Sequence, residues 1–405
     1  MSKKPLEGVK VVEFGTYVAA PAAARIMADW GADVVKVEPP KGEPWRYMGA
    51  PYGLPCTSEE NPIFFLYNAN KRCVAIDFRT TQGMEVFHRL MKDADVFITN
   101  YRPGVLKKMG LTYDVLKEKY PKLVYAMFTG FGEVGPDAQR PGFDAAAYWA
   151  KGGAIGTWTP KGEAPFRPSA ATGDNPTGIA LLAGILTALY RQAKTGEGDK
   201  VSASLYGAAI WHNSTGIMAS QAHYGIDFVR PLDQPESPLI NSYECADGRW
   251  LNFGITDYDN FFPLLCNLIG EEDAAKEERY NSFRAARKCM PEIVAIFRRG
   301  FAKKSSDQWV SILTENDVNF ERIQNFADVE QDEQAWANHF LLEYQFPSGT
   351  KAMIPNVPVQ FESLGNPDPV NSPGIGGNTL AVLRELGYSE AELQSMQETK
   401  IIYQE

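Results

Sequence analysis

The chain has 405 residues, long enough for two or three domains or for one large α/β unit with an appendage. Hydrophobic residues make up 44% and charged residues 22%, as in folded globular proteins, so a wholly disordered chain is excluded. The 50 acidic residues outnumber the 40 Lys and Arg and give a net charge of -10. This charge argues against nucleic acid as the main partner but allows a local basic pocket for a small phosphorylated ligand.

The five cysteines lie far apart and form no C-x-x-C pair, so we expect no metal site. A sparse and odd set of cysteines is typical of a reducing compartment. The first residues, MSKKPLEGVKVVEF, contain no apolar signal segment, and the longest apolar stretch, Gly178 to Tyr190, is too short to span a bilayer. The sequence therefore predicts a cytoplasmic protein without a membrane partner.

The first part of the chain alternates apolar strands with amphipathic helices. Strands are predicted at Val9–Phe14, Ala32–Val37, Cys73–Phe78, Val96–Thr99 and Lys122–Phe128, and helices at Ala19–Trp30, Gln82–Met91 and Leu116–Tyr120. This alternation predicts an α/β fold with a mostly parallel sheet covered by helices on both faces.

The pattern changes after Gly130, where Gly and Pro are frequent and loops are predicted as far as Gly173. A long apolar helix at Pro176–Gln192, a strand at Val201–Leu205 and a helix at Tyr206–Ser220 follow. The stretch Asp227–Pro238 contains three prolines among mixed charges, and we place a domain boundary there. Beyond it we predict hairpins at Ser242–Ala246 with Trp250–Phe253 and at Tyr344–Phe346 with Ala352–Pro355, and helices at Asp259–Ile269, Pro291–Phe301, Asp307–Glu315, Thr379–Leu386 and Glu390–Gln397.

The N-terminal strand–helix–strand unit resembles a dinucleotide-binding site only in part. Glu38 ends the second strand, where an acid that binds a ribose would lie, but it could equally be a solvated acid at a strand end. The turn after the first strand reads GTYVAAPAA and lacks G-x-G-x-x-G. Alanine and proline there would keep a pyrophosphate away from the backbone, which argues against a nicotinamide or flavin enzyme.

The four histidines, His88, His212, His223 and His339, lie in no known catalytic motif. We expect His88 to pack or lie at the surface and His212 to be a core or interface residue. Metalloenzyme and serine-hydrolase chemistry therefore lack their usual residues.

The segment ATGDNPTG around Asp174 is the most informative one, because it precedes the long apolar helix. Asp174 could simply be an N-cap, with Pro176 in the first turn. Alternatively, the helix N-terminus keeps the carboxylate ionised, and an ionised Asp beside glycines is a nucleophile that needs no general base. Backbone N–H groups of the glycine turn could then bind a developing oxyanion. A lone carboxylate fits acyl transfer through an anhydride.

The wider sequence resembles the class III CoA-transferase family over nearly its whole length. The similar pieces are VKVVEFGTYVAAPAAARIMADWGADVVKVEPPKGEPWR, NANKRCVAIDFR, TNYRPGVLKKMGL, TGFGEVGP, TGDNPTG and TGEGDKVSASLYGAAIW. The resemblance implies a large Rossmann-like domain built from both chain ends, with a smaller inserted α+β domain, in an interlocked homodimer. We expect residues 1–225 and 331–405 to form the large domain and residues 226–330 the small one.

The resemblance also implies roles for individual residues. Asp174 matches the nucleophile, which forms an aspartyl anhydride and then an aspartyl-CoA thioester. CoA thioesters are implied as substrates, without a tightly bound cofactor. Lys71, Arg72 and Lys107 are further candidates for the phosphates of CoA. The residues that match the family's CoA-contacting stretches are Val18, Ala19, Ile76, Asp77, Phe78, Arg79, Asn100, Tyr101, Arg102, Lys108, Phe128, Thr129, Gly130 and Phe131.

The chain departs from some relatives in ways that bear on its substrate. Pro39 and Thr129 replace basic residues, and LDQPESPLINSYE stands where oxalate-active relatives have a glycine-rich flap. The stretches YVAAPAAARIMADWGADVVKVE and DEQAWAN resemble the branch that transfers CoA to 2-hydroxy acids such as phenyllactate or 2-hydroxyisocaproate. That branch serves amino-acid fermentation and implies a 2-hydroxyacyl-CoA dehydratase as the next enzyme. Aromatic residues that suit either an apolar acyl chain or the core are Tyr17, Trp45, Tyr47, Phe131, Trp149 and Trp158.

Two alternatives use the same fold. A 2-methylacyl-CoA racemase would need a histidine close to Thr129, and no histidine occurs between His88 and His212. The other alternative is a catalytically silent CoA-binding protein. The presence of both Gly173 and Asp174 of the motif argues against it.

Overall fold

The structure is a computed structural model that describes residues 4–231, 234–365 and 368–405. It divides into two compact units. Unit 1 comprises Met1–Ala154, Arg167–Met218 and Glu333–Glu405, and unit 2 comprises Ile155–Phe166 and Ala219–Asp332. The domain limits expected from the sequence stay a prediction. The segment LDQPESPLINSYE begins with Leu232 and Asp233, which lie outside the described residues.

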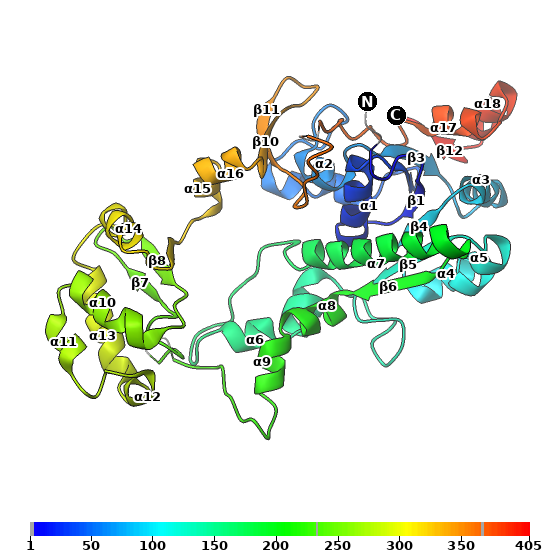
Figure 1. Cartoon of the computed structure of the whole chain (residues 1–405). Coiled ribbons are helices and arrows are strands. Elements are labelled where there is room, and N and C mark those ends of the chain that lie inside the picture. The colour runs from blue at the N-terminus through cyan, green and yellow to red at the C-terminus, as the bar shows by residue number, and fades with distance from the viewer. Residues whose placement is uncertain (1–3, 232–233, 366–367) are drawn as a thin grey trace. The chain divides into compact units, whose positions relative to one another are not determined.

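A seven-stranded sheet forms the centre of unit 1, in the order β12-β3-β2-β1-β4-β5-β6 (Figure 1). Six neighbouring strands are parallel, and only β12 at the edge pairs antiparallel, with β3. The predicted α/β fold with a mostly parallel sheet is confirmed. The strands are β1 (Lys10–Phe14), β2 (Asp33–Glu38), β3 (Arg72–Ile76), β4 (Val96–Thr99), β5 (Val124–Thr129), β6 (Lys200–Ser204) and β12 (Ile402–Tyr403).

Helices cover both faces of this sheet, because successive side chains of a strand point to opposite faces. Val11 of β1 packs into one core with helices α1 (Ala19–Asp29) and α7 (Asp174–Thr195). Val12, the next residue, packs into a second core on the opposite face. The helices of that second core include α3 (Thr81–Lys92), α4 (Pro103–Met109), α5 (Tyr113–Lys119), α17 (Thr379–Glu385) and α18 (Glu390–Glu398).

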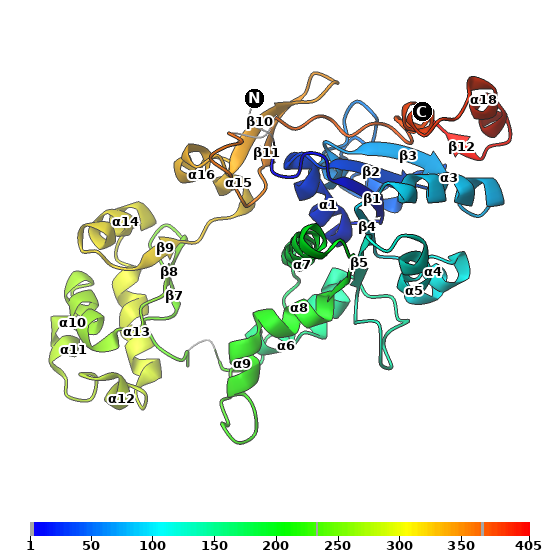
Figure 2. The same ribbon diagram turned by 45° about the vertical axis from the view of Figure 1, so that its right-hand side comes forward.

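The starts of α1 and α7 are packed closely together. A Cβ at Gly178 would lie 2.6 Å from the carbonyl oxygen of Ala19, so only glycine fits there. Figure 2 shows α7 beside α1 on the same face of the sheet. The residue that begins α7 is thereby fixed near the loop between β1 and α1.

The shorter elements of unit 1 were partly missed. The helix predicted over Tyr206–Ser220 is divided at Asn213, whose Nδ2 donates to the carbonyl oxygen of Ala209 at 2.9 Å. The segment expected to be loops after Gly130 contains a π-helix and a short α-helix. The remaining elements that lie wholly or partly in unit 1 are η1 (Pro44–Tyr47), η2 (Ala50–Tyr52), α2 (Pro62–Asn68), η3 (Ala145–Ala150), α6 (Ala154–Trp158), α8 (Leu205–His212), α9 (Ser214–Ala219), α16 (Glu333–Ala337), β10 (Leu341–Gln345) and β11 (Lys351–Pro355).

Unit 2 packs helices around a small antiparallel sheet. The predicted hairpin is confirmed as β7 (Ser242–Glu244) with β8 (Trp250–Phe253), to which β9 (Phe320–Arg322) adds a third strand. Its helices are α10 (Tyr258–Leu268), α11 (Glu272–Lys276), α12 (Phe283–Ala286), α13 (Met290–Phe301), α14 (Ser306–Glu315) and α15 (Phe326–Val329). Among the described residues of the chain, no helix is long and apolar enough to cross a membrane.

Candidate functional site

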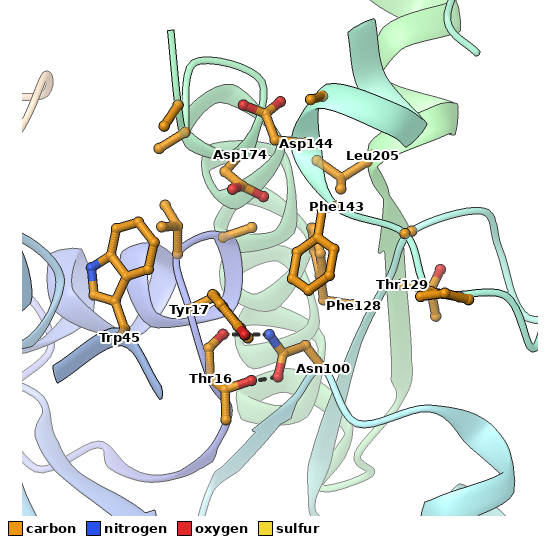
Figure 3. A pocket seen from close by; sticks show the side chains of 18 of the residues that line it. Thr16, Tyr17, Trp45, Asn100, Phe128, Thr129, Phe143, Asp144, Asp174 and Leu205 are labelled. Atoms are coloured by element: carbon orange, nitrogen blue, oxygen red, sulfur yellow. Dashed lines mark hydrogen bonds between the residues drawn. The ribbon is translucent and has the colours of Figure 1, made fainter. Parts of the chain in front are cut away.

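A pocket of about 990 Å³ opens in unit 1 at the carboxyl ends of β1, β4 and β5. β1 lies between β2 and β4, so the direction of the strand order reverses between β1 and β4. Crevices at such reversal points are the usual ligand sites of open parallel sheets. Figure 3 shows the pocket with Asp144 and Asp174 at one end and aromatic side chains beside them.

Many of the residues that the resemblance assigned to CoA lie on this pocket, but some do not. The lining includes Val18, Ala19, Asn100, Tyr101, Arg102, Phe128, Thr129 and Gly130, together with Asp174. Ile76, Asp77, Phe78, Arg79, Lys108 and Phe131 are not lining residues, and their contact with CoA stays a prediction. The side chain of Arg79 forms an ion pair with Asp77 at 2.7 Å.

Two of the additional phosphate candidates are already engaged within the protein. Lys71 is buried, and its Nζ donates to Glu13 at 2.6 Å and to Asn68 at 3.0 Å. Arg72 pairs with Asp33 and Glu385. We therefore withdraw the buried Lys71 as a phosphate ligand, whereas the partly exposed Arg72 and the exposed Lys107 of α4 stay predictions.

Glu38 has neither of the roles considered for it. Its side chain is buried, and both carboxylate oxygens accept from the Arg46 guanidinium, at 2.8 and 2.7 Å. The solvated acid at a strand end is thus wrong. A ribose-binding role is equally excluded by geometry, because the buried carboxylate is bound to arginine and does not line the pocket.

Asp174 begins α7 but is not its N-cap. Gly173 has the N-cap position, and the half-buried Asp174 side chain lines the pocket. Burial, reinforced by the negative charge of Asp144, raises the pKa of Asp174 to about 7. The helix N-terminus was expected to keep this carboxylate ionised; with a pKa of about 7, about half of it is ionised at neutral pH.

Asp144 was missed by the sequence analysis. It is buried, lines the same pocket, and its Oδ1 accepts the backbone N–H of Gly173 at 3.1 Å. A Cβ at Gly173 would lie 2.3 Å from that oxygen and 2.4 Å from the ring of Tyr148, so the turn requires glycine. Because the Gly173 N–H is already bonded, it is not available to bind an oxyanion. The only signal in the sequence was an acid in the glycine- and proline-rich stretch RPGFD.

Aromatic side chains form one wall of the pocket. The ring of Tyr17 lies 6.1 Å from that of Trp45 and 5.1 Å from that of Phe143, measured between centroids. Of the predicted aromatic residues, Tyr17 and Trp45 line the pocket. Tyr47, Phe131, Trp149 and Trp158 do not, and Phe143 was not anticipated.

The loop between β1 and α1 forms another part of the pocket. The Asn100 side chain, at the end of β4, accepts from the Thr16 N–H at 3.0 Å and donates to the Thr16 carbonyl at 2.6 Å, as the dashed lines in Figure 3 show. Adjacent strand ends are thereby linked across the point where the strand order reverses.

The histidines lie outside the pocket lining. Nδ1 of His88 is 3.2 Å from the Tyr120 hydroxyl, and Nδ1 of His212 is 2.6 Å from that of Tyr148. In the part of the chain that the structure describes, no group of three His, Cys, Asp or Glu residues is placed to hold a metal ion.

Comparison with known proteins identifies the family. The family model described as CoA-transferase family III matches residues 6–379. The chain is 39% identical over 397 residues to the (R)-2-hydroxy-4-methylpentanoate CoA-transferase of Clostridioides difficile, covering 98% of this chain and 99% of the relative. It is also 39% identical over 399 residues to the cinnamoyl-CoA:phenyllactate CoA-transferase of Clostridium sporogenes, covering 98% and 96%.

The fold agrees with solved structures of similar proteins. The crystal structure of a CAIB/BAIF family protein from Brucella suis superposes with a TM-score of 0.80 at 28% identity, covering 95% of this chain and all of that chain. The chain belongs to CoA-transferase family III. It is thus a transferase whose substrates are CoA thioesters.

Proposed function

We propose that the protein moves CoA from an acyl- or enoyl-CoA to a 2-hydroxy carboxylic acid, with Asp174 as the nucleophile. The proposal rests above all on one observation: the half-buried carboxylate of Asp174 lines the pocket at the start of α7. Relatives that transfer CoA to such acids support the acceptor class. The reaction is a transfer of a sulfur-containing group.

The proposed reaction preserves the thioester through exchange. The Asp174 carboxylate attacks the donor carbonyl, and the C–S bond breaks to give a mixed anhydride and CoA thiolate. The thiolate then attacks the aspartyl carbonyl, which forms the aspartyl-CoA thioester and releases the donor acid. The acceptor carboxylate repeats the first step on this thioester, and the thiolate takes up the acceptor acyl group and restores Asp174.

Asp144 orients the nucleophile in this scheme. Its bond to the Gly173 N–H fixes the turn that begins α7, and its charge helps to raise the pKa of Asp174 to about 7. A carboxylate of that pKa is more basic than an ordinary aspartate and is still about half ionised at neutral pH. Burial therefore favours nucleophilicity without removing the reactive form.

The aromatic wall supports an acceptor with an apolar side chain. Tyr17, Trp45 and Phe143 offer ring faces and edges, and Met48 adds a flexible apolar contact. Arginines that also line the pocket, Arg102, Arg140 and Arg167, are suited to the phosphates of CoA or the acceptor carboxylate.

The transferase proposal is favoured over the two alternatives. A racemase of this fold would use a histidine as a base, and among the described residues that line the pocket there is none. A silent CoA-binding protein would have no need of the buried Asp144 beside the half-buried Asp174, since taking carboxylates out of water is costly. We also propose that the protein forms a homodimer and lies in the cytoplasm, and that a dehydratase acts on its product.

The nucleophile is tested with Asp174→Asn, which keeps the shape of the side chain. We expect transfer to fall by at least about 1,000-fold, because the covalent route is lost. Asp114→Asn is the matched control, since Asp114 occupies the first turn of α5 but does not line the pocket.

An isotope experiment separates the covalent route from a direct transfer. In the proposed scheme, an acceptor acid labelled with ¹⁸O in its carboxylate leaves one labelled oxygen on Asp174, and mass spectrometry of that peptide detects it. Full turnover by Asp174→Asn, or turnover without label at Asp174, would reject the mechanism.

The acceptor class is tested with a panel of acids against one acyl-CoA donor. We expect kcat/KM for phenyllactate and 2-hydroxyisocaproate to exceed that for lactate by about tenfold or more, because each buried CH₂ contributes about 0.8 kcal/mol. Oxalate should be poorer still, since a second carboxylate would face the aromatic wall. A preference for oxalate or lactate would contradict the proposal that the aromatic wall binds the apolar side chain of the acceptor acid.

A further inference from the structure

Glu43 lies outside the pocket lining, yet it contacts two residues that form the pocket wall. Its side chain is buried, and Oε2 accepts the backbone N–H of Tyr17 at 3.1 Å and that of Trp45 at 3.0 Å. These two aromatic residues are far apart in the sequence and come together in the wall. A single carboxylate oxygen thus fixes the backbone of both.

Tyr17 needs such a restraint because its backbone is strained. Its φ is 63°, in the left-handed region that bulky residues rarely adopt. The residues before it are held as well: the Lys36 ammonium donates to the Gly15 carbonyl at 3.0 Å, and Asn100 binds both polar groups of the Thr16 backbone. Three side chains from different elements therefore hold three successive loop residues.

A buried cation holds Glu43 in place. Lys36 Nζ lies 3.2 Å from Oε1 of Glu43 and donates to Oε1 of Glu13 at 2.7 Å, and all three side chains are buried. Burial disfavours the charge on Lys36, but the carboxylates of Glu13, Glu43 and Glu38 outweigh it and raise the pKa of Lys36. Buried charges are costly unless they are paired. The pairing of Lys36 with Glu13 and Glu43 therefore holds these side chains in one arrangement beneath the loop that contains Tyr17.

We propose that Glu43, paired with Lys36, is a positioning residue that holds Tyr17 and Trp45 in the conformation that binds the acyl group. Glu43 itself does not contact the substrate. The inference rests on the proposed function, because it assigns the aromatic wall to the acyl chain of the acid. Beyond that function, the inference assigns Glu43 an effect on substrate specificity, which it exerts by holding the backbone of Tyr17 and Trp45.

The test is a double-mutant cycle of Glu43→Ala with Tyr17→Gly. In the wild-type background we expect Glu43→Ala to lower kcat/KM for phenyllactate by about tenfold to 100-fold, mostly through KM, as for a lost hydrogen bond to a charged group. In the Tyr17→Gly background the same change should cost at least about threefold less than in the wild type, because glycine adopts a positive φ without strain and the ring is already absent, so only the bond to Trp45 is still lost. Equal losses in both backgrounds would overturn the proposal.

A control separates positioning from general stability. Asp29→Asn weakens another buried pair of unit 1, in which Asp29 accepts from Arg25 at 2.7 Å and from Asn70 at 2.6 Å, away from the pocket lining. It should lower Tm without changing KM. Glu43→Gln, which keeps one acceptor oxygen but loses the charge, should give an intermediate KM and fold normally, so it replaces Glu43→Ala if that variant is unstable.

Hydrogen exchange gives a readout that does not depend on activity. The amide of Tyr17 should exchange at least about tenfold faster in Glu43→Gln or Glu43→Ala, whereas α1 stays protected. Unchanged exchange at Tyr17 would reject the role of Glu43. If exchange accelerates while Asp174→Asn remains active, the positioning role stands and the proposed function fails, so the two outcomes are distinguishable.

Discussion

At the scale of single residues, the two acids at the end of the pocket determine the response to pH. Asp174 has a pKa of about 7 because it is buried near the charge of Asp144. Burial also raises the pKa of Asp144, although the backbone N–H groups of Ala171, Thr172 and Gly173 oppose the shift. Because the two acids interact, a pKa measured from a pH profile would belong to the pair.

We predict that kcat/KM rises with pH and levels off above about pH 7, since only ionised Asp174 attacks the thioester. Asp144→Asn removes a negative charge, so it should lower the pKa of Asp174 and move the rising limb to lower pH by about one unit. The pH profiles of the two proteins check this. A profile that is flat from about pH 5.5 to 8 would contradict it.

Stability should respond in the opposite direction. The pKa of Asp174 is higher in the folded protein than in the unfolded chain, so its contribution is fully present below the unfolded value and is lost as pH rises through about 7. Asp174→Asn should therefore be more stable than the wild type at pH 8, by on the order of 1–4 kcal/mol, and lose most of this advantage at pH 5. Thermal unfolding at both pH values measures the difference.

Single residues also show where sequence reasoning reached its limit. The sequence singled out Asp174, because a glycine, an acid and a proline before an apolar helix form a local pattern. The partners Asp144 and Glu43 were not found, since their importance depends on backbone groups 29 and 26 residues away. The burial of Glu38 was missed for the same reason. It depends on Arg46, which a 3₁₀ helix places so that its guanidinium binds the Glu38 carboxylate.

At the scale of elements, the central strands were predictable because they are mostly apolar runs, interrupted internally only by the buried charges Glu13 of β1 and Lys36 of β2. β4 has the predicted bounds Val96–Thr99, and the other parallel strands differ from the prediction by one or two residues at an end. Strands buried on both faces have little choice of composition, which makes the signal strong. The edge strand β12 has only two residues and was missed, because pairing with β3 defines it rather than its own pattern.

The packing of α1 against α7 places the starts of both helices, including the reactive Asp174, at the pocket. Gly178 lets α7 approach Ala19 at the start of α1, so both helix starts lie at the pocket. Ala171, just before α7, has a φ of 66° and is a second left-handed residue that lines the pocket. Backbone strain thus occurs on both sides of the site, in Tyr17 and Ala171, where packing of the two helices can support it.

At the scale of the whole molecule, the proposed homodimer is the remaining prediction. The resemblance to the family implies two interlocked chains, and α8 presents Trp211 and Ile210 with 76% and 41% of their surfaces exposed. Large exposed apolar groups on one helix are typical of an interaction surface. We therefore expect light scattering to give about twice the 44.9 kDa mass of one chain.

A pair of variants tests whether α8 contributes to that interface. Trp211→Glu would bury a charge between the chains, so its dimer dissociation constant should rise by at least about tenfold, whereas Trp211→Phe keeps an apolar ring and should behave as the wild type. Concentration-dependent light scattering compares the two. A monomeric wild type would refute the dimer itself. Equal dissociation constants for the two variants would leave the dimer but remove α8 from its interface, because a charge at Trp211 is tolerated only where water still reaches it.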